Sequence, residues 1–404
     1  MSREQMMNWL NAGHFVDHYF LMIFPLAALA IEREWQVGYG DALGLGTALY
    51  VGFALGTLPA GWLGDVWRRD VLIALLFVGC GLASILIALA PNVTLFMVAL
   101  GLLGLAASIY HPVGLSMITA ISDTPGRSLA MNGVWGNMGL AAAALTTGLM
   151  AETWGWRSAF LLPGVISLGI GGIFWWACSK TSEIPSRHAE VSPSNTAGLV
   201  DRGRTIRVIA VVMTAAVFGG LVFNGVTITL PKLFELRLPE NLAELSGVGG
   251  FSALVFAIAA FAQLPVGVLL DRHGAKIVFA TILVFQIVAM WVVAYSYGLQ
   301  VVPIATVLVL LIFAELPVTG YLVGRHVSDS WRARVFSVEY VFSLGVGALV
   351  VPGVAVFVNA GFEFDALYRV FAACALIILV AVIVLLPGFE NRTVRGGGTT
   401  QLRP

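Results

Sequence analysis

The stretch Leu-Pro-Ala-Gly-Trp-Leu-Gly-Asp-Val-Trp-Arg-Arg at residues 58–69 returns in weaker form as Leu-Pro-Val-Gly-Val-Leu-Leu-Asp-Arg-His-Gly-Ala at residues 264–275. The two stretches lie 206 residues apart. The same offset relates further pairs along the chain: Pro25 and Pro231, Ser122-Asp123 and Ser328-Asp329, Gly155 and Gly361. Several matches in one register indicate an internal duplication. The sequence therefore predicts two structurally related halves.

The composition places these halves in a membrane. Hydrophobic residues make up 59% of the chain and charged residues only 11%, whereas a soluble domain carries about 25% charged residues. A membrane-spanning helix needs ~20 mostly apolar residues. Twelve stretches meet this requirement, near residues 8–30, 42–64, 71–90, 94–118, 128–150, 157–179, 207–230, 246–269, 276–297, 301–323, 334–357 and 366–387. We expect an all-α membrane protein with twelve transmembrane helices in two pseudo-symmetric six-helix bundles.

The polar stretches between these spans divide the chain. The predicted parts are a first six-helix bundle at 1–180, a cytoplasmic linker at 181–206, a second bundle at 207–388 and a cytoplasmic tail at 389–404. The linker is rich in Ser, Pro and charged residues without an apolar period. A net charge of zero gives no indication of a nucleic-acid partner, and the three cysteines lie far apart, so no disulfide framework is expected.

Basic residues predict the orientation. Lys and Arg are enriched on the cytoplasmic side of membrane proteins. Of the 22 Lys and Arg residues, seventeen fall on one side of the predicted spans. The remaining five fall on the other side: Arg33, Arg157, Lys232, Arg237 and Arg369. Both termini are therefore expected to be cytoplasmic, in a multi-pass protein of the bacterial inner (plasma) membrane.

Residues 61–69, Gly-Trp-Leu-Gly-Asp-Val-Trp-Arg-Arg, resemble the loop motif between helices 2 and 3 of the major facilitator superfamily. Residues 267–274 are similar to the echo of that motif between helices 8 and 9, and residues 155–160 resemble the family's run before helix 6. Together these motifs extend over nearly the whole chain. The resemblance implies the major facilitator fold, transport by alternating access, and a central cavity lined by helices 1, 4, 7 and 10.

Shorter motifs resemble the fosmidomycin-resistance branch of drug exporters. These are Tyr110-His111-Pro112 in helix 4, the run at 136–139 in helix 5, and His14, Asp17 and Pro25 in helix 1. The chain also departs from the superfamily's drug antiporters. The helix-4 arginine would fall near Ala99 or Leu100, and no proline follows Gly139 within helix 5.

Ionisable groups inside a membrane cost roughly 2.5–3.5 kcal/mol each and are therefore functional candidates. They concentrate on the helices that the resemblance assigns to the cavity. The predicted residues for proton coupling or the substrate cavity are His14, Asp17, His18, Tyr110, His111, Asn137, Asn224, Glu315 and Glu339.

Helix 1 carries the densest group. His14 and His18 lie on one helix face because four-residue steps stack, and Asp17 lies three residues after His14. A carboxylate next to imidazoles can change protonation near physiological pH. We predict that Asp17, assisted by His14 or His18, binds and releases the coupling proton, and that Glu315 faces it from the second half.

Purely structural roles are the alternative for these residues. His14 and Asp17 would then only hydrogen-bond neighbouring helices, and His111 would satisfy a backbone carbonyl freed by Pro112. Glu339 lies near the expected cytoplasmic end of helix 11 and would pair with Arg334 or Arg127. The sequence leaves both interpretations open.

A conformational gate is expected in the duplicated loops. A carboxylate at a helix end can cap a neighbouring helix and pair with arginine. The resemblance implies that such contacts latch the outward-facing state. The predicted gate residues are Gly61, Asp65, Arg68, Arg69, Asp271 and Arg272.

The predicted function is proton-coupled efflux of a small organic compound or drug by an antiporter that works as a monomer without a cofactor. No Lys or Arg lies at mid-membrane depth, which argues against a carrier for phosphorylated compounds. Two alternatives remain: a divalent metal-ion transporter with a His, Asp and Glu site, and a proton-coupled uptake permease. An enzyme is not expected, because no polar loop carries a nucleophile with its base.

Overall fold

The computed structural model describes residues 1–180 and 202–386, and these residues form helices without any strand. The first half consists of α1 (Arg3–Trp35), α2 (Tyr39–Gly44), α3 (Thr47–Val66), α4 (Arg69–Leu89), α5 (Val93–Ala107), η1 (Tyr110–Gly114), α6 (Leu115–Ile121), α7 (Pro125–Trp154) and α8 (Ser158–Ser179). The second half consists of α9 (Arg202–Thr214), η2 (Ala215–Gly219), α10 (Gly220–Arg237), η3 (Glu240–Leu242), α11 (Leu245–Ala260), α12 (Gln263–His273), α13 (Ala275–Ala294), η4 (Gly298–Gln300), α14 (Val301–His326), α15 (Asp329–Gly345), α16 (Gly347–Asn359) and α17 (Phe364–Leu385).

These elements join into twelve spans, six in each half, which confirms the predicted fold class. Eleven of the spans are long and apolar enough to cross a membrane. The twelfth is α7, whose mean hydropathy is lowered by Asn132, Asn137 and Thr147. All three side chains are buried. The polar groups of α7 therefore face the protein rather than lipid.

Several spans that the sequence predicts as continuous are broken. Helix 2 is split into α2 and α3, helix 8 into α11 and α12, and helix 11 into α15 and α16. Helices 4 and 7 each contain one π-helical turn, η1 and η2. The last residues of the predicted linker, 202–206, are helical, because α9 begins at Arg202. The rest of the linker and the predicted tail lie outside the described residues.

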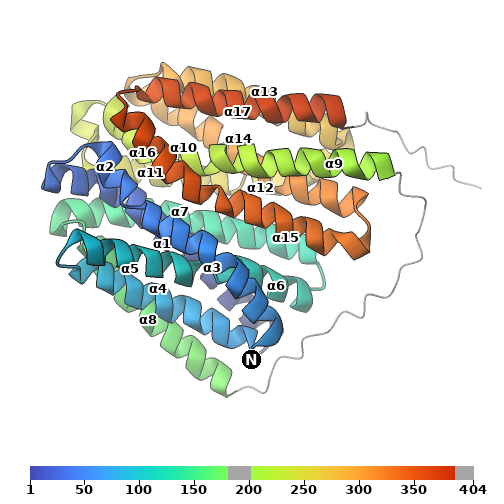
Figure 1. The fold of residues 1–404 in the computed structure, drawn as a ribbon, viewed down its shortest axis with the longest axis horizontal. Helices are drawn as coiled ribbons and strands as arrows, with labels where there is room; N and C mark the ends of the chain where they lie inside the picture. The colour runs from blue at the N-terminus through green and yellow to red at the C-terminus, as the bar shows by residue number, and fades with distance from the viewer. Residues whose placement is uncertain (181–201, 387–404) are drawn as a thin grey trace, which may run out of the picture.

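The two halves form two bundles that lie against each other, with the blue-to-green helices on one side and the yellow-to-red helices on the other (Figure 1). We call the end where α1 begins and α17 stops the near end, and the end where α1, α7 and α10 stop the far end. Toward the far end, α7 crosses α11 at Gly148 and Gly249. A Cβ atom on either glycine would lie 3.0 Å from the Cα atom of the other. This contact brings the backbones of the two bundles together.

Glycines also permit close helix packing within each bundle, as small residues commonly do in membranes. A Cβ atom on Gly81 of α4 would lie 2.8 Å from the carbonyl oxygen of Gly164 on α8. A Cβ atom on Gly139 of α7 would collide with the carbonyl oxygen of Phe15 on α1. The outer surface carries exposed apolar side chains such as Leu55, which suits contact with lipid.

We predict that Gly104→Ala destabilises the first bundle. The new methyl group would collide with the carbonyl oxygen of Leu49 and would lie 2.7 Å from the amide nitrogen of Phe53, both on α3. Overpacking of this kind costs about 1–3 kcal/mol, which should lower the thermal unfolding midpoint of the purified protein in detergent. Gly101→Ala is the matched control, because its Cβ atom would meet only the Ala48 carbonyl, at 3.6 Å. Equal midpoints for the two variants would contradict this prediction.

Candidate functional site

Four ionisable side chains converge inside the first bundle. They are His14, Asp17 and His18 of α1 and His111 of η1. One nitrogen or oxygen atom from each lies within 4.8 Å of the corresponding atoms of the other three. The Asp17 Oδ2 atom is 3.1 Å from His111 Nε2 and 4.0 Å from His18 Nε2. We refer to these residues as the His/Asp cluster.

Local helix geometry explains this convergence. The spacing on α1 stacks His14 under His18 and turns Asp17 toward helix 4. Helix 4 contributes His111 from a π-helical turn at Tyr110–Gly114. Such turns are rare in proteins, and those that occur are often found at functional sites. His111 lies at an ion-pair distance from Asp17. Its imidazole therefore contacts a carboxylate, which the purely structural role of satisfying a carbonyl freed by Pro112 does not include.

The cluster is largely removed from solvent. Asp17 is fully buried and His14 is 6% exposed, whereas the side chains of His18 and His111 retain 14% and 12% exposure. Among the described residues, neither the Oδ1 atom of Asp17 nor the Nε2 atom of His14 has a hydrogen-bond partner. Buried polar atoms without partners are uncommon in native proteins and indicate a functional demand.

A second layer of hydrogen bonds orients His14. Its Nδ1 atom lies 2.8 Å from the carbonyl oxygen of Asn132 on α7. The Asn132 side chain donates to Asn11 Oδ1 at 3.0 Å, and its Oδ1 atom lies 3.0 Å from the Tyr110 hydroxyl. That hydroxyl also lies 2.8 Å from the carbonyl oxygen of Leu10. The Tyr110 ring stacks on the His14 imidazole with a centroid distance of 4.7 Å, so the imidazole is held by both its edge and its face.

Asn132 is a residue of this site that is not among the predicted site residues. The residue is fully buried and contacts α1 and η1. Its position beside the cluster depends on how α7 packs against α1. The available signal was an asparagine within a predicted span, one turn before the run at 136–139.

The His/Asp cluster does not include the other predicted cavity residues of α7 and the second half. Glu315 on α14 is 7% exposed, and a Cβ atom on Gly219 of η2 would lie 2.7 Å from its Oε1 atom. Asn224 donates to the carbonyl oxygen of Gly220 in its own helix at 2.9 Å. Asn137 is buried on α7. Glu339 is half-buried on α15. The structure therefore brings together the predicted residues of helices 1 and 4 and does not place Glu315 among them.

The predicted gate residues lie at the near end. Asp65 is 81% exposed, and its carboxylate is 3.9 Å from Arg69. Arg69 donates to the carbonyl oxygen of Gly64 at 2.8 Å, and Arg68 pairs with Asp70. Among the described residues, no hydrogen bond or ion pair across the two bundles involves the remaining members of the predicted gate: Gly61, Asp271 and Arg272. Asp271 and Arg272 are exposed.

The far end holds a charge network that the sequence analysis does not predict. Lys232 of α10 lies 2.7 Å from Glu32 of α1 and 2.6 Å from Glu235 of its own helix. Arg33 lies 2.7 Å from Glu235 and 3.3 Å from Glu244. These contacts join the C-terminal ends of α1 and α10, which are the first spans of the two halves. Opposite charges at these two helix ends were visible in the sequence, but their pairing depends on how the bundles pack.

Two further contacts reinforce the far end. The backbone amide of Ser246 donates to Glu152 of α7 at 2.7 Å, and Asn359 of α16 donates to Asp41 of α2 at 2.8 Å. Both connect the two bundles. We call these contacts, together with the network around Lys232, the far-end clasp.

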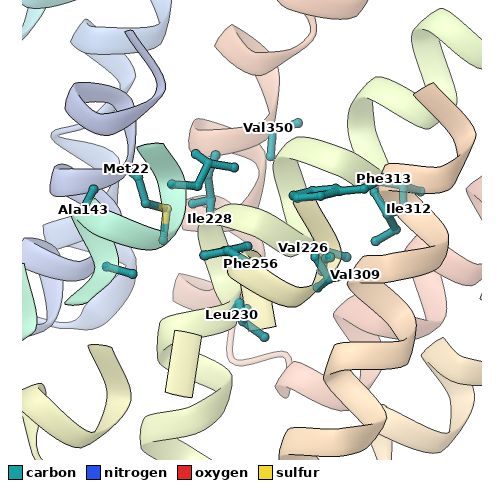
Figure 2. Close-up of a cluster of buried hydrophobic side chains, with 14 of the residues drawn as sticks. Met22, Ala143, Val226, Ile228, Leu230, Phe256, Val309, Ile312, Phe313 and Val350 are labelled. Carbon is teal, nitrogen blue, oxygen red and sulfur yellow. The ribbon is translucent and has the colours of Figure 1, made fainter. Parts of the chain in front are cut away.

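A buried apolar cluster extends from α1 and α7 of the first bundle into the second bundle (Figure 2). Met22 of α1 and Ala143 of α7 face Ile228 of α10 and Phe256 of α11. Such a layer excludes water between the two bundles.

The chain is similar to known proteins in both sequence and fold. A family model described as Major Facilitator Superfamily matches residues 10–261, more than half of the chain. The chain belongs to the major facilitator superfamily. This family transports solutes, so the expectation that the protein is not an enzyme is confirmed.

Multidrug resistance protein MdtG of Escherichia coli O17:K52:H18 is 21% identical over 365 residues, covering 88% of each chain. MdtG of strain O6:K15:H31 is 22% identical over 372 residues, with the same coverage.

Solved structures share the fold. A D-xylose-proton symporter has a TM-score of 0.76 at 14% identity and covers 96% of this chain and 98% of its own. A bacterial homologue of the human lysosomal transporter Spinster, in an inward-facing and unoccupied conformation, has a TM-score of 0.69 at 16% identity, with coverage of 95% and 94%. These comparisons confirm the superfamily but do not single out the fosmidomycin-resistance branch.

We predict that Tyr110→Phe destabilises the protein. The substitution leaves the buried Asn132 Oδ1 atom and the carbonyl oxygen of Leu10 without their shared donor, at a cost of about 1–3 kcal/mol. The thermal unfolding midpoint in detergent should therefore fall. Tyr50→Phe is the control, because the Tyr50 hydroxyl makes only a 3.5 Å contact with the carbonyl oxygen of Leu21. A Tyr110→Phe variant as stable as Tyr50→Phe would contradict this role.

Proposed function

We propose that the protein is a proton-coupled antiporter that exports a small organic compound across a bacterial inner membrane by alternating access. Relatives named multidrug resistance proteins match it over 88% of its length. The observation that carries the proposal is Asp17, a fully buried carboxylate at membrane depth within reach of two imidazoles. Ionisable residues in such positions mark ion pathways and proton relays.

The proton transfer follows from the distances. A proton on His111 Nε2 can pass to Asp17 Oδ2 across the 3.1 Å contact and can leave by the same route. His18 Nε2 lies 4.0 Å from the same Oδ2 atom and supplies a second imidazole. The Nδ1 atom of His14 is hydrogen-bonded to the Asn132 carbonyl oxygen, and the His14 ring packs against the rings of His18 and His111. His14 therefore positions His18 and His111 around Asp17.

We infer that a water route to the cluster starts at the near end. A cavity of about 280 Å³ lies between the start of α1 and the start of α7. It is lined by Met7, Asn11, Thr124, Arg127, Ser128 and Met131. Asn11 in its wall accepts a hydrogen bond from Asn132, which in turn holds His14. The distribution of Lys and Arg favours a cytoplasmic near end, so this route would lead from the cytoplasm to the coupling site.

The conformation fits one stage of alternating access. The far-end clasp joins the bundles, while Asp65, Asp271 and Arg272 are exposed at the near end. With a cytoplasmic near end, this is an inward-facing state. In the outward-facing state the clasp would break, and the near-end residues, with Arg68 and Arg69, would latch the bundles.

We predict that Lys232→Gln opens the far end. Without the ammonium group, the carboxylates of Glu32 and Glu235 face each other without their shared cation. Removing one member of a partly buried ion pair should weaken this closed end by about 2 kcal/mol, or roughly 30-fold in population. Arg157→Gln is the control, because its pair with Glu34 lies at the same end but within one bundle.

The measurement is the electron-spin distance between labels at Val37 and Glu240. These exposed positions lie at the far end on different bundles. The three native cysteines would first be replaced by alanine. We expect a longer-distance population in Lys232→Gln and not in Arg157→Gln. The same distance distribution in both variants would reject the clasp as a gate.

We predict that Asp17→Asn abolishes proton-driven transport while keeping substrate binding. The amide has nearly the shape of the carboxylate but cannot carry the coupling proton. Proteoliposomes would be loaded with a panel of cationic, neutral and anionic fluorescent dyes, and dye export against an imposed proton gradient would be recorded. Export of the transported dye should fall at least tenfold, and equilibrium binding should change less than threefold.

Asp123→Asn is the control, because Asp123 is an exposed loop carboxylate of the same bundle. Proton-driven flux that persists in Asp17→Asn would remove Asp17 as the coupling group. The direction of the gradient tests the alternative of an uptake permease. An antiporter drives dye against the proton flow, whereas accumulation in the direction of proton flow would identify a symporter.

A further inference from the structure

We propose that the His/Asp cluster is a binding site for a divalent transition-metal ion of the Zn²⁺ class. Three imidazoles and one carboxylate form the donor set. Zn²⁺, Co²⁺ and Ni²⁺ favour this combination, whereas Mg²⁺ and Ca²⁺ favour sites made of oxygen. This inference rests on the geometry of the cluster and does not depend on the direction of transport or on the exported compound.

The separations of the donor atoms are close to those of a metal site. Bonds of 2.0–2.1 Å at a tetrahedral zinc ion place neighbouring ligand atoms about 3.3 Å apart. The Asp17 Oδ2 to His111 Nε2 distance is 3.1 Å, the distance to His18 Nε2 is 4.0 Å, and all four donor atoms fall within 4.8 Å. Shifts of up to about 1.5 Å in the longest separations would complete the coordination sphere, which rotation of the Asp17, His18 and His111 side chains can supply.

The hydrogen bond to His14 selects the form of the ring that can bind a metal. Its Nδ1 atom faces the Asn132 carbonyl at 2.8 Å and therefore carries the proton. The Nε2 atom then presents a lone pair, and it is buried without a partner in the described structure. A metal-binding histidine typically donates its other nitrogen to a backbone carbonyl or carboxylate in this way.

Both faces of the His14 ring are packed. A Cβ atom added to Gly136 of α7 would lie 2.7 Å from His14 Nε2 and 2.8 Å from both Cδ2 and Cε1. Nearly equal distances to three ring atoms place Gly136 against the face of the ring, not along the lone pair in its plane. Tyr110 stacks parallel to the same ring. The ring is therefore fixed, and neither of these two neighbours occupies the lone-pair direction of Nε2.

The charge of Asp17 gives the site its affinity for a cation. Its carboxylate is fully buried, and its Oδ1 atom has no hydrogen-bond partner among the described residues. A buried carboxylate without compensation is costly, and a bound divalent cation would supply that compensation. The partial exposure of His18 and His111 provides an entrance for the ion.

The test uses the full chain, purified in detergent without a polyhistidine tag. Titration calorimetry with ZnCl₂, CoCl₂ and MgCl₂ should give one saturable Zn²⁺ or Co²⁺ site per chain and no heat with Mg²⁺. Asp17→Asn, His18→Gln and His111→Gln should each weaken binding at least tenfold. His273→Gln is the matched control, because His273 is exposed at the near end and should leave the affinity unchanged.

Two readouts separate this site from adventitious binding and from misfolding. The absorption spectrum of the Co²⁺ form should show nitrogen and oxygen ligation without sulfur charge-transfer bands, since Cys80, Cys178 and Cys374 lie outside the cluster. Each variant must elute as a single species in gel filtration and unfold cooperatively. No saturable Zn²⁺ or Co²⁺ binding, cobalt bands from sulfur, or full affinity in all three well-folded variants would overturn the proposal. Because no proton gradient is involved, these outcomes are independent of the transport assay.

Discussion

A carboxylate fully enclosed in a membrane-embedded helix bundle is the constraint on which the first half of the protein depends. Burial of a charge costs several kcal/mol unless partners surround it. The first bundle supplies these partners with His18 on the same helix and His111 on helix 4. His18 is one residue from Asp17 on α1, whereas His111 reaches Asp17 from the π-helical turn of helix 4. Next to this group, α7 packs tightly on α1 at Gly136 and Gly139. In this bundle, the stabilisation of the buried carboxylate therefore depends on how the helices pack.

The two duplicated halves differ in their buried ionisable residues. The offset of 206 residues preserves Pro25 as Pro231, but it maps His14 to Gly220, Asp17 to Phe223 and His111 to Pro317. The second half thus keeps the scaffold without the cluster. Its buried acidic residue, Glu315, lies on a different helix and packs beside η2. The proposed ion-binding site therefore lies in one half, and the matching positions of the other half have no equivalent of it.

Sequence patterns predict features that depend on short distances along the chain. Apolar length predicts the twelve spans, and helical spacing predicts that His14 and His18 share a face. Features that depend on how distant helices pack are not predictable in this way. Asn132 is such a case, because its contacts with Asn11 and Tyr110 cross three helices. The breaks within helices 2, 8 and 11 were also missed, since hydropathy averages over a span and does not register a local change in backbone direction.

The charged residues at the two ends of the molecule differ in how far they are buried and paired. The far-end clasp consists of charges that are partly buried and paired across the bundles, so separating them exposes several ion pairs to water at once. The near-end charges are already solvated, and bringing them together costs desolvation. A ligand shifts such an equilibrium only by its differential affinity for the two states. Occupancy of Asp17 can do this, because neutralising the carboxylate removes the requirement that His18 and His111 remain closed around it. The cluster in one bundle would thereby influence contacts between both.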